Sequence, residues 1–235
     1  MTDETTTTDA PQRGGFLRFL AQAWLVLLLA GCFGVALAVV EKFTRPRIDA
    51  NVKARIAEKL VEMFGEGTTT AEPVELTGEI EGREREVLCY PALRGGELAG
   101  WGILAHGKGY DEMILLIGVD ADVATLKGYR VIKSLETPGI GDKIKADRSD
   151  FHQQFEGQWA AKKLELASAD ATTEASPTGK INAISQATIS SKGVVTTINQ
   201  HLAALRESLK KADWRAARAK PPAELEEGWG KGARN

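Results

Sequence analysis

The sequence predicts an α+β protein, in which a single N-terminal transmembrane helix precedes a domain with an antiparallel sheet flanked by helices. Three observations support this. An uncharged apolar run covers residues 21–40. From about residue 74, short segments of strand-like pattern alternate with turn residues. A last segment with apolar residues at helical spacing ends near residue 211. We therefore divide the chain into a disordered cytoplasmic N-terminus (1–18), a transmembrane helix (19–41), a juxtamembrane helix (42–66), the main domain (67–212) and a flexible C-terminal tail (213–235).

Composition narrows the class of protein. The 235 residues are 43% hydrophobic and 26% charged, with a formal net charge of -2. These values are typical of a globular chain. The near-neutral charge gives no electrostatic footprint for nucleic acid, so we expect no nucleic-acid partner. The two cysteines, Cys32 and Cys89, form neither a disulfide framework nor a metal-ligand spacing.

The run from Ala21 to Val40 is long enough to cross a membrane. About 20 helical residues at about 1.5 Å each span about 30 Å, the hydrocarbon thickness of a bilayer. A cleaved signal peptide is one alternative. A lipoprotein signal is another, because Leu29-Ala30-Gly31-Cys32 resembles a lipobox. The apolar run continues for eight residues after Cys32, however, which favours a retained span. Lysine and arginine are denser after the span than before it, but large domains cross membranes largely regardless of charge.

Helical spacing continues after the span, and the pattern then changes. The juxtamembrane helix is predicted from Ile48, Val52, Ile56, Leu60, Met63 and Phe64. Four strands are predicted at Glu86–Tyr90, Leu98–His106, Met113–Asp120 and Leu126–Ser134. The third is apolar on both faces and suits a central strand. A short helix is predicted near 150–159, and a strong one from about Lys192 to Lys211. We expect His201 to lie on the exposed face of this last helix.

The sequence ISQATISSKG, residues 184–193, places four hydroxyl side chains at the entry to the last helix. One interpretation is structural: Ser190 or Ser191 caps the helix, and Thr188 lies in a short extended segment. The other interpretation is functional. A helix N-terminus offers free N–H groups and the positive end of a dipole, which favours a phosphate. Hydroxyls add donors, and one could bond covalently to phosphorus.

Two segments carry a family resemblance. Ser185, Ala187 and Thr188 match the covalent-FMN motif of the Rnf and Nqr electron-transport subunits, in which a run like Asp-x-x-Ser-Gly-Ala-Thr bears the flavin. Glu136-Thr137-Pro138-Gly139-Ile140-Gly141 is similar to the family's Glu-Thr-Pro-Gly-x-Gly loop. The chain departs from the motif at Gln186, where the family has glycine, and at Asn182, where it has aspartate. The resemblance covers roughly residues 20–210 and is greatest to the G subunit of Rnf-type complexes.

The resemblance implies a cofactor and a role. Residues 67–212 would be an FMN-binding domain, with FMN esterified through its phosphate to Thr188 by a flavin transferase that uses FAD. Further cofactor-binding residues would be Ser185, Ala187, Ser190, Ser191, Glu136, Thr137, Pro138, Gly139, Ile140 and Gly141, with no catalytic or metal-binding residue. The chain would be an electron-transfer subunit, without turnover of its own, of a membrane-bound ion-translocating ferredoxin:NAD oxidoreductase. Other complex subunits would be its partners, and the domain would lie on the periplasmic side. The alternative is a membrane-anchored binding, sensory or scaffold domain without a covalent flavin.

Overall fold

The computed structural model describes residues 15–170 and 177–211. The expected flexible tail lies outside these residues, as does the expected disordered N-terminus except for 15–18, which belong to the first helix. The chain divides into two compact units, Met1–Asn51 and Val52–Asn235.

Helix α1 is continuous from Gly15 to Phe64 and contains Pro46. The sequence predicted two helices here, a transmembrane helix at 19–41 from the uncharged apolar run and a juxtamembrane helix at 42–66, with Pro46 near the start of the second. The apolar part of α1 is long and hydrophobic enough to cross a membrane. Its large side chains, such as Leu27, Phe33 and Leu37, are more than half exposed. A lipid-facing helix has this surface, because every backbone group is satisfied within the helix and the apolar side chains face outward.

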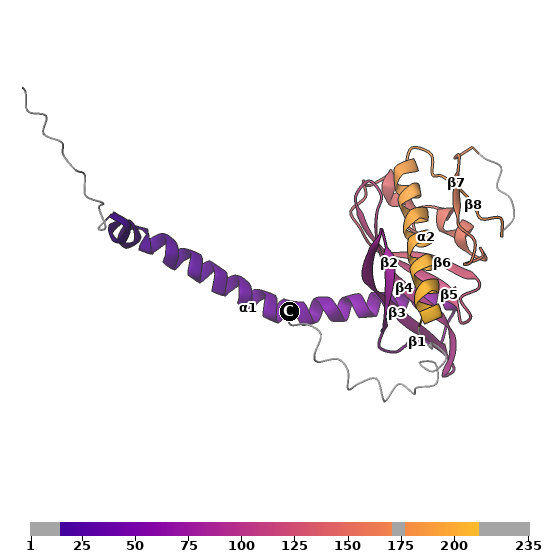
Figure 1. Ribbon diagram of the computed structural model, residues 1–235, viewed down its shortest axis with the longest axis horizontal. Coiled ribbons are helices and arrows are strands. Elements are labelled where there is room, and N and C mark those ends of the chain that lie inside the picture. Colours follow the sequence, from indigo (N-terminus) through magenta and orange to yellow (C-terminus); the bar gives the residue numbers. More distant parts are fainter. Residues whose placement is uncertain (1–14, 171–176, 212–235) are drawn as a thin grey trace, which may run out of the picture. The chain divides into compact units, whose positions relative to one another are not determined.

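A six-stranded antiparallel sheet forms the centre of the second unit (Figure 1). Its path is β1-β3-β4-β5-β6, with β2 paired to β3. The strands are β1 (Thr68–Thr70), β2 (Val74–Ile80), β3 (Arg83–Arg94), β4 (Glu97–Lys108), β5 (Glu112–Asp120) and β6 (Leu126–Ser134). All four predicted strands are confirmed, and β5 is a central strand whose residues Leu115 to Val119 are buried. Strands β1 and β2 were not predicted.

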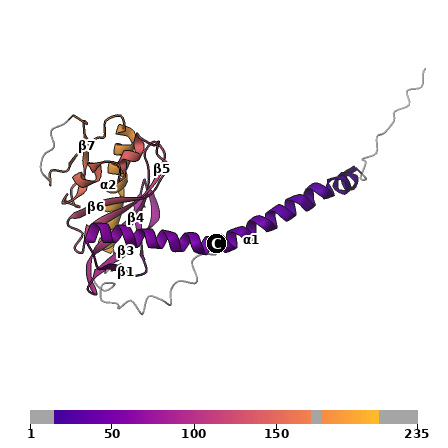
Figure 2. The same ribbon diagram turned by 180° about the vertical axis from the view of Figure 1, so that it is seen from behind.

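Helices cover both faces of the sheet, as predicted. Helix α2 (Thr188–Lys211) lies on one face (Figure 1), where Val194, Ile198 and Leu202 pack against the main core. The last turns of α1 lie on the other face (Figure 2), where Ile56 and Leu60 pack against a smaller core. Apolar side chains alternate along the strands, so each face buries its own set.

Short elements close one end of the main core. These are two 3₁₀ helices, η1 (Gly141–Ile144) and η2 (Asp150–Phe155), and a parallel pair of strands, β7 (Glu165–Ala167) and β8 (Lys180–Asn182). The Tyr129 ring meets the Phe155 ring edge-on at 4.9 Å, and its hydroxyl donates to the Ile144 carbonyl at 2.7 Å. This buried tyrosine therefore links the sheet to both 3₁₀ helices.

Arg130 joins the last turns of α1 to the sheet. Its Nε donates to Glu62 of α1 at 3.1 Å, and its Nη1 donates to the Tyr129 carbonyl at 2.9 Å. Glu156 lies 3.7 Å from Nη2. The arginine is 9% exposed, so these partners replace most of its hydration. Burying a guanidinium without them would be costly.

We expect Arg130→Met to lower the unfolding free energy by about 1–3 kcal/mol, because hydrogen bonds to charged groups contribute on that scale. Thermal unfolding of the full chain in detergent measures this. The matched control is Arg148→Met, since Arg148 pairs with Asp147 at 3.4 Å on the exposed surface. Such pairs contribute about 0–1 kcal/mol. Equal losses in both variants would contradict a special role for Arg130.

Candidate functional site

Helix α2 begins at Thr188, four residues earlier than predicted. Thr188 is therefore the first helical residue rather than part of an extended segment. Ser190 and Ser191 lie within the first turn, so neither can be the residue that caps the helix from outside. The first intrahelical bond runs from the Ser191 amide to the Ala187 carbonyl at 2.9 Å. The amides of the preceding positions in the first turn have no acceptor within the helix.

The two serines of the first turn have internal structural roles. Ser191 is fully buried; its hydroxyl accepts from the Ile184 amide and donates to the Ala187 carbonyl, both at 2.9 Å. It thus ties the incoming chain to the helix. Ser190 is 3% exposed and donates to Glu136 Oε2 at 2.7 Å. The capping interpretation was wrong in geometry, although both hydroxyls do stabilise the start of the helix.

Glu136 is the point at which the two predicted motifs meet. It is 5% exposed. Its Oε1 accepts from the Tyr110 amide at 2.9 Å and from the Asp111 amide at 3.3 Å, while Oε2 accepts from Ser190. One carboxylate therefore joins the β4–β5 turn, the loop after β6 and the first turn of α2. Charge-assisted hydrogen bonds of this kind are stronger than neutral ones.

Three glycines allow these segments to approach one another. A Cβ at Gly109 would overlap Glu136 Oε1, and one at Gly141 would overlap Oε2. A Cβ at Gly193 would lie 2.5 Å from the Gly109 Cα. No side chain fits at any of these three places. The packing roles of Gly109 and Gly193 were not predicted from the sequence; a glycine in the turn and another in the helix were the available signals.

The loop from Thr137 to Gly141 is a tight turn beside this junction. The Ile140 amide donates to the Thr137 carbonyl at 3.2 Å, Pro138 and Gly139 are the central residues, and Gly139 has a φ of 78°. This is the pattern of a type II turn, which requires glycine at its third position. Thr137, Pro138, Gly139 and Ile140 are exposed, whereas Gly141 is buried beneath Glu136. The loop therefore has an outer surface next to α2.

Gln186 explains why the resembled motif has a glycine at this position. Its φ is 66°, in the left-handed region that costs a residue with a Cβ roughly 1–2 kcal/mol. The residue is exposed, so its side chain points away from the packed junction. A left-handed backbone conformation is therefore one requirement that glycine would meet at this position. Glutamine meets it with strain.

The exposed residues of the junction differ from the buried ones. Thr188 and Ser185 are exposed, and neither hydroxyl has a hydrogen bond to any described residue. Large apolar side chains lie next to the junction in the sequence: Tyr110 is 70% exposed, Leu135 56%, Ile140 45% and Ile189 60%. The structure thus brings the two motifs together and leaves Thr188 exposed, while Ala187, Ser190 and Ser191 are buried.

Comparison with known proteins identifies the family to which the chain is related. Residues 109–203 match the family model described as FMN-binding domain. The chain is 31% identical over 219 residues to the G subunit of the ion-translocating oxidoreductase complex of Cereibacter sphaeroides, covering 86% of this chain and 92% of the relative. It is 34% identical over 125 residues to the G subunit of the Na(+)-translocating ferredoxin:NAD(+) oxidoreductase complex of Acetobacterium woodii, covering 52% and 57%.

Among solved structures, NqrC of Shewanella oneidensis is similar with a TM-score of 0.49 and 20% identity, over 61% of this chain and 68% of that chain. The assignment rests on the sequence relatives and on the matched domain. Both agree with the resemblance seen in the residues around Thr188 and Glu136. The chain belongs to the family of G subunits of ion-translocating oxidoreductase complexes, and residues 109–203 lie in its FMN-binding domain.

Proposed function

We propose that Thr188 carries FMN as a phosphoester and that the chain passes electrons within an ion-translocating oxidoreductase complex of the Rnf type. The proposal is based on the exposure and hydrogen bonding of the hydroxyl side chains at the start of α2. Thr188, the first helical residue, is exposed and has no hydrogen bond to a described residue, whereas Ser190 and Ser191 are buried and bonded.

Burial selects among the four hydroxyls of the motif. A transferase must bring a phosphorus atom into contact with the acceptor oxygen, and it cannot do so at Ser190 or Ser191 without opening the first turn. The Ser190 proton is also engaged by the Glu136 carboxylate at 2.7 Å. Ser185 is accessible but precedes the helix. Thr188 alone combines access with a place in the first turn.

The first turn would also stabilise the charge of the product. A phosphodiester at Thr188 keeps one negative charge. The helix N-terminus supplies partial positive charge and unpaired amides at that end. The Glu136 carboxylate would oppose an anion, but its oxygens are directed to two backbone amides and the Ser190 hydroxyl. These donors compensate its charge within the protein.

Attachment of FMN to Thr188 would be a transfer from FAD that needs no oxidant or reductant. The Thr188 oxygen would form a bond to the FMN phosphorus of FAD, the bond from that phosphorus to the AMP portion would break, and AMP would leave as the threonine proton is released. Bound FMN supplies electron acceptance and donation, and the protein supplies position and surroundings. The exposed apolar side chains Tyr110, Ile140 and Ile189 would shield the isoalloxazine from water, and the outer surface of the Thr137–Gly141 turn would form one wall of its site.

The anchor and the relatives support a place in a membrane complex. Helix α1 includes one segment able to cross a membrane. We infer that the other subunits of the complex are its partners, that a flavin transferase modifies it during maturation, and that the flavin domain lies on the periplasmic side. In this role the subunit has no turnover by itself.

Thr188→Val should abolish covalent flavin, because valine keeps the shape of threonine without the hydroxyl. Chain purified from a host with the transferase would lose in-gel flavin fluorescence and the added mass of one FMN less one water. Thr188→Ser should restore both signals. Ser185→Ala is the matched control and should remain flavinylated.

Two results would contradict the proposal. Full fluorescence in Thr188→Val would show that another residue is the acceptor. A wild-type chain without flavin after maturation with an active transferase would instead favour a membrane-anchored binding or scaffold domain.

Glu136→Ala should weaken the junction that presents Thr188. The Tyr110 and Asp111 amides and the Ser190 hydroxyl would lose their acceptor, which should lower the unfolding free energy by about 2–4 kcal/mol. We also expect slower flavinylation by purified transferase and FAD, followed at a temperature where the variant is folded. Glu75→Ala, on an exposed position of β2, is the control. Unchanged stability and rate in Glu136→Ala would exclude this role.

The side of the membrane can be tested with one added thiol. Cys89 is buried, and burial raises its pKa to about 12, so it stays protonated and unreactive at neutral pH. A thiol placed at the exposed β4 position by Glu97→Cys should react in intact cells with a membrane-impermeant maleimide. The unsubstituted chain should stay unlabelled, because the other cysteine, Cys32, lies in the apolar segment expected to be within the bilayer, out of reach of an impermeant reagent. Labelling only after permeabilisation would place the domain in the cytoplasm.

A further inference from the structure

Strands β3 and β4 diverge at one end of the sheet. Strand β3 pairs with β2 over residues 83–89 but with β4 only over residues 88–94. Residues 83–87 of β3 and 105–108 of β4 therefore form the two sides of a fork. The β2–β3 hairpin leans onto α2 beyond this point: the Ser208 hydroxyl donates to the Thr77 carbonyl, and a Cβ at Gly78 would lie 2.6 Å from the Ala204 Cβ.

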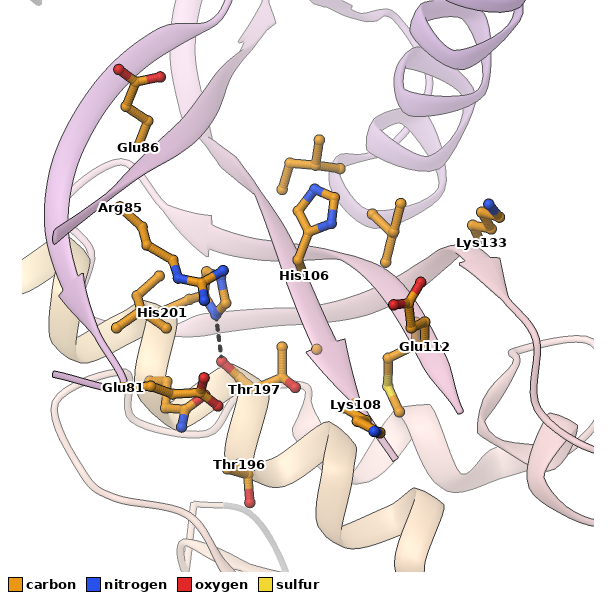
Figure 3. Close-up of a pocket in the computed structure, with 16 residues that line it drawn as sticks. Glu81, Arg85, Glu86, His106, Lys108, Glu112, Lys133, Thr196, Thr197 and His201 are labelled. Atoms are coloured by element: carbon orange, nitrogen blue, oxygen red, sulfur yellow. Dashed lines mark hydrogen bonds between the residues drawn. The ribbon is translucent and has the colours of Figure 1, made fainter. Parts of the chain in front are cut away.

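A cavity of about 540 Å³ occupies this fork (Figure 3). That volume is within the range of small-molecule sites, about 300–1,000 Å³. None of its lining residues belongs to the proposed FMN-binding set. Its charged and titratable groups come from every surrounding element: Glu81, Arg85, Glu86, His106, Lys108, Glu112, Lys133 and His201.

Arg85 is the central cation of the cavity. It extends toward His201 in Figure 3 and has no ion pair or side-chain hydrogen bond with any described residue. Its partner on β2 is Gly78, which offers no side chain. Glu81 and Glu86 also line the cavity, and both are exposed. Lys108 and Glu112 are partners in the register of β4 and β5. Arg85 is itself exposed and makes no ion pair with either of these glutamates.

His201 brings a second basic group into the same space. The sequence predicted it on the exposed face of the helix, but it is 4% exposed because the β2–β3 hairpin covers this part of α2. Its Nδ1 lies 2.8 Å from the Thr197 carbonyl and donates to it, and Nε2 has no hydrogen bond to a residue that the structure describes. Burial lowers the His201 pKa, and the nearby His106 and Arg85 lower it further, against the Thr197 carbonyl and Glu81.

Apolar side chains form the rest of the wall. Ile80, Leu104, Met113 and Ile114 line the cavity beside the basic groups. A ligand that fits must therefore pair with a guanidinium at one end and lie on hydrocarbon at the other. A guanidinium matches the two oxygens of a carboxylate with parallel hydrogen bonds.

We propose that the β3–β4 fork is a second ligand site, which binds a small organic carboxylate with an apolar body. The carboxylate lies between Arg85, His106 and His201, and the apolar body lies on Leu104 and Met113. The site is separate from the attachment of FMN at Thr188.

Binding at this site is linked to protons. A neutral His201 presents a lone pair at Nε2 toward the ligand, whereas a protonated ring presents a donor. The bound carboxylate therefore raises the His201 pKa from its depressed value, and binding takes up a proton. Affinity increases as the pH falls from 8 toward the ordinary histidine range near 6.5. Glu81 weakens this dependence, since it favours the protonated ring before any ligand binds.

The test is calorimetric titration of the full chain in detergent with benzoate, which stays ionised over this pH range. We expect saturable binding, at least about fivefold tighter at pH 6 than at pH 8. Repeating the titration in two buffers of different ionisation enthalpy measures the protons taken up. Benzyl alcohol, which has the same ring without the charge, should bind at least about tenfold more weakly.

Variants identify the site. Arg85→Gln should weaken benzoate binding at least about tenfold. His201→Gln should reduce the pH dependence, and His201→Gln combined with His106→Gln should remove it, since both rings face the carboxylate. Arg83→Gln is the matched control, since Arg83 is exposed on the same strand and does not line the cavity. Equal effects of Arg85→Gln and Arg83→Gln, or equal binding of benzyl alcohol, would overturn the proposal.

The same titration on FMN-loaded chain and on Thr188→Val separates this site from the flavin. Equal affinity in both supports an independent site. Binding only to the flavin-free chain would mean that the cavity belongs to the flavin, and would overturn the proposal without affecting the assignment of Thr188. If Arg85→Gln fails to fold, the proposal can still be tested on the unsubstituted chain. Benzoate binding without proton uptake at pH 7 would contradict the role of His201.

Discussion

The arrangement of the site depends on one buried carboxylate. Glu136 accepts hydrogen bonds from the Tyr110 and Asp111 amides and from the Ser190 hydroxyl, so three segments distant in sequence share one acceptor group. A buried charge is stable only when its lone pairs are filled, which fixes all three partners at once. The glycines at 109, 141 and 193 follow from this constraint, because no Cβ fits between segments this close. The position of the first turn of α2, and with it the exposure of Thr188, depends on this interaction.

The same interaction helps to explain why several hydroxyl side chains lie at the start of the last helix. The Ser191 hydroxyl binds the incoming chain, and the Ser190 hydroxyl binds Glu136. Thr188 is exposed, and its hydroxyl has no hydrogen bond to any described residue. A chain that needs one reactive hydroxyl at a helix start must make its neighbours unreactive or omit them. Here burial and hydrogen bonding make Ser190 and Ser191 unreactive. The residues that fix the structure and the residue proposed to carry the flavin therefore occupy adjacent positions with opposite environments.

The sequence pattern within a segment was enough to predict the elements whose structure depends mainly on that segment's own residues. Strand β5 was predicted because its apolar residues leave no solvent face, and the span because its length matches a bilayer. Strand β2, VELTGEI, was not predicted, because charged residues alternate along it and because it contains Gly78. The glycine is needed there because α2 approaches so closely that a Cβ would overlap Ala204. The start of α2 was misplaced because Ser190 and Ser191 look like caps until Glu136, 54 residues away, is brought beside them. His201 was taken for a surface residue because its cover is a distant hairpin. Each error concerns a contact between segments far apart in sequence.

Helix α2 is fastened at both ends: Ser190 binds Glu136 near its start, and Ser208 binds the Thr77 carbonyl near its last turn. Its apolar face is buried along the sheet between these points. The backbone at the first residue of such a helix is held in place by the fold of the domain. A cofactor attached there would have a fixed point of attachment, and the length of the linker between that point and its ring would set how far the ring could reach.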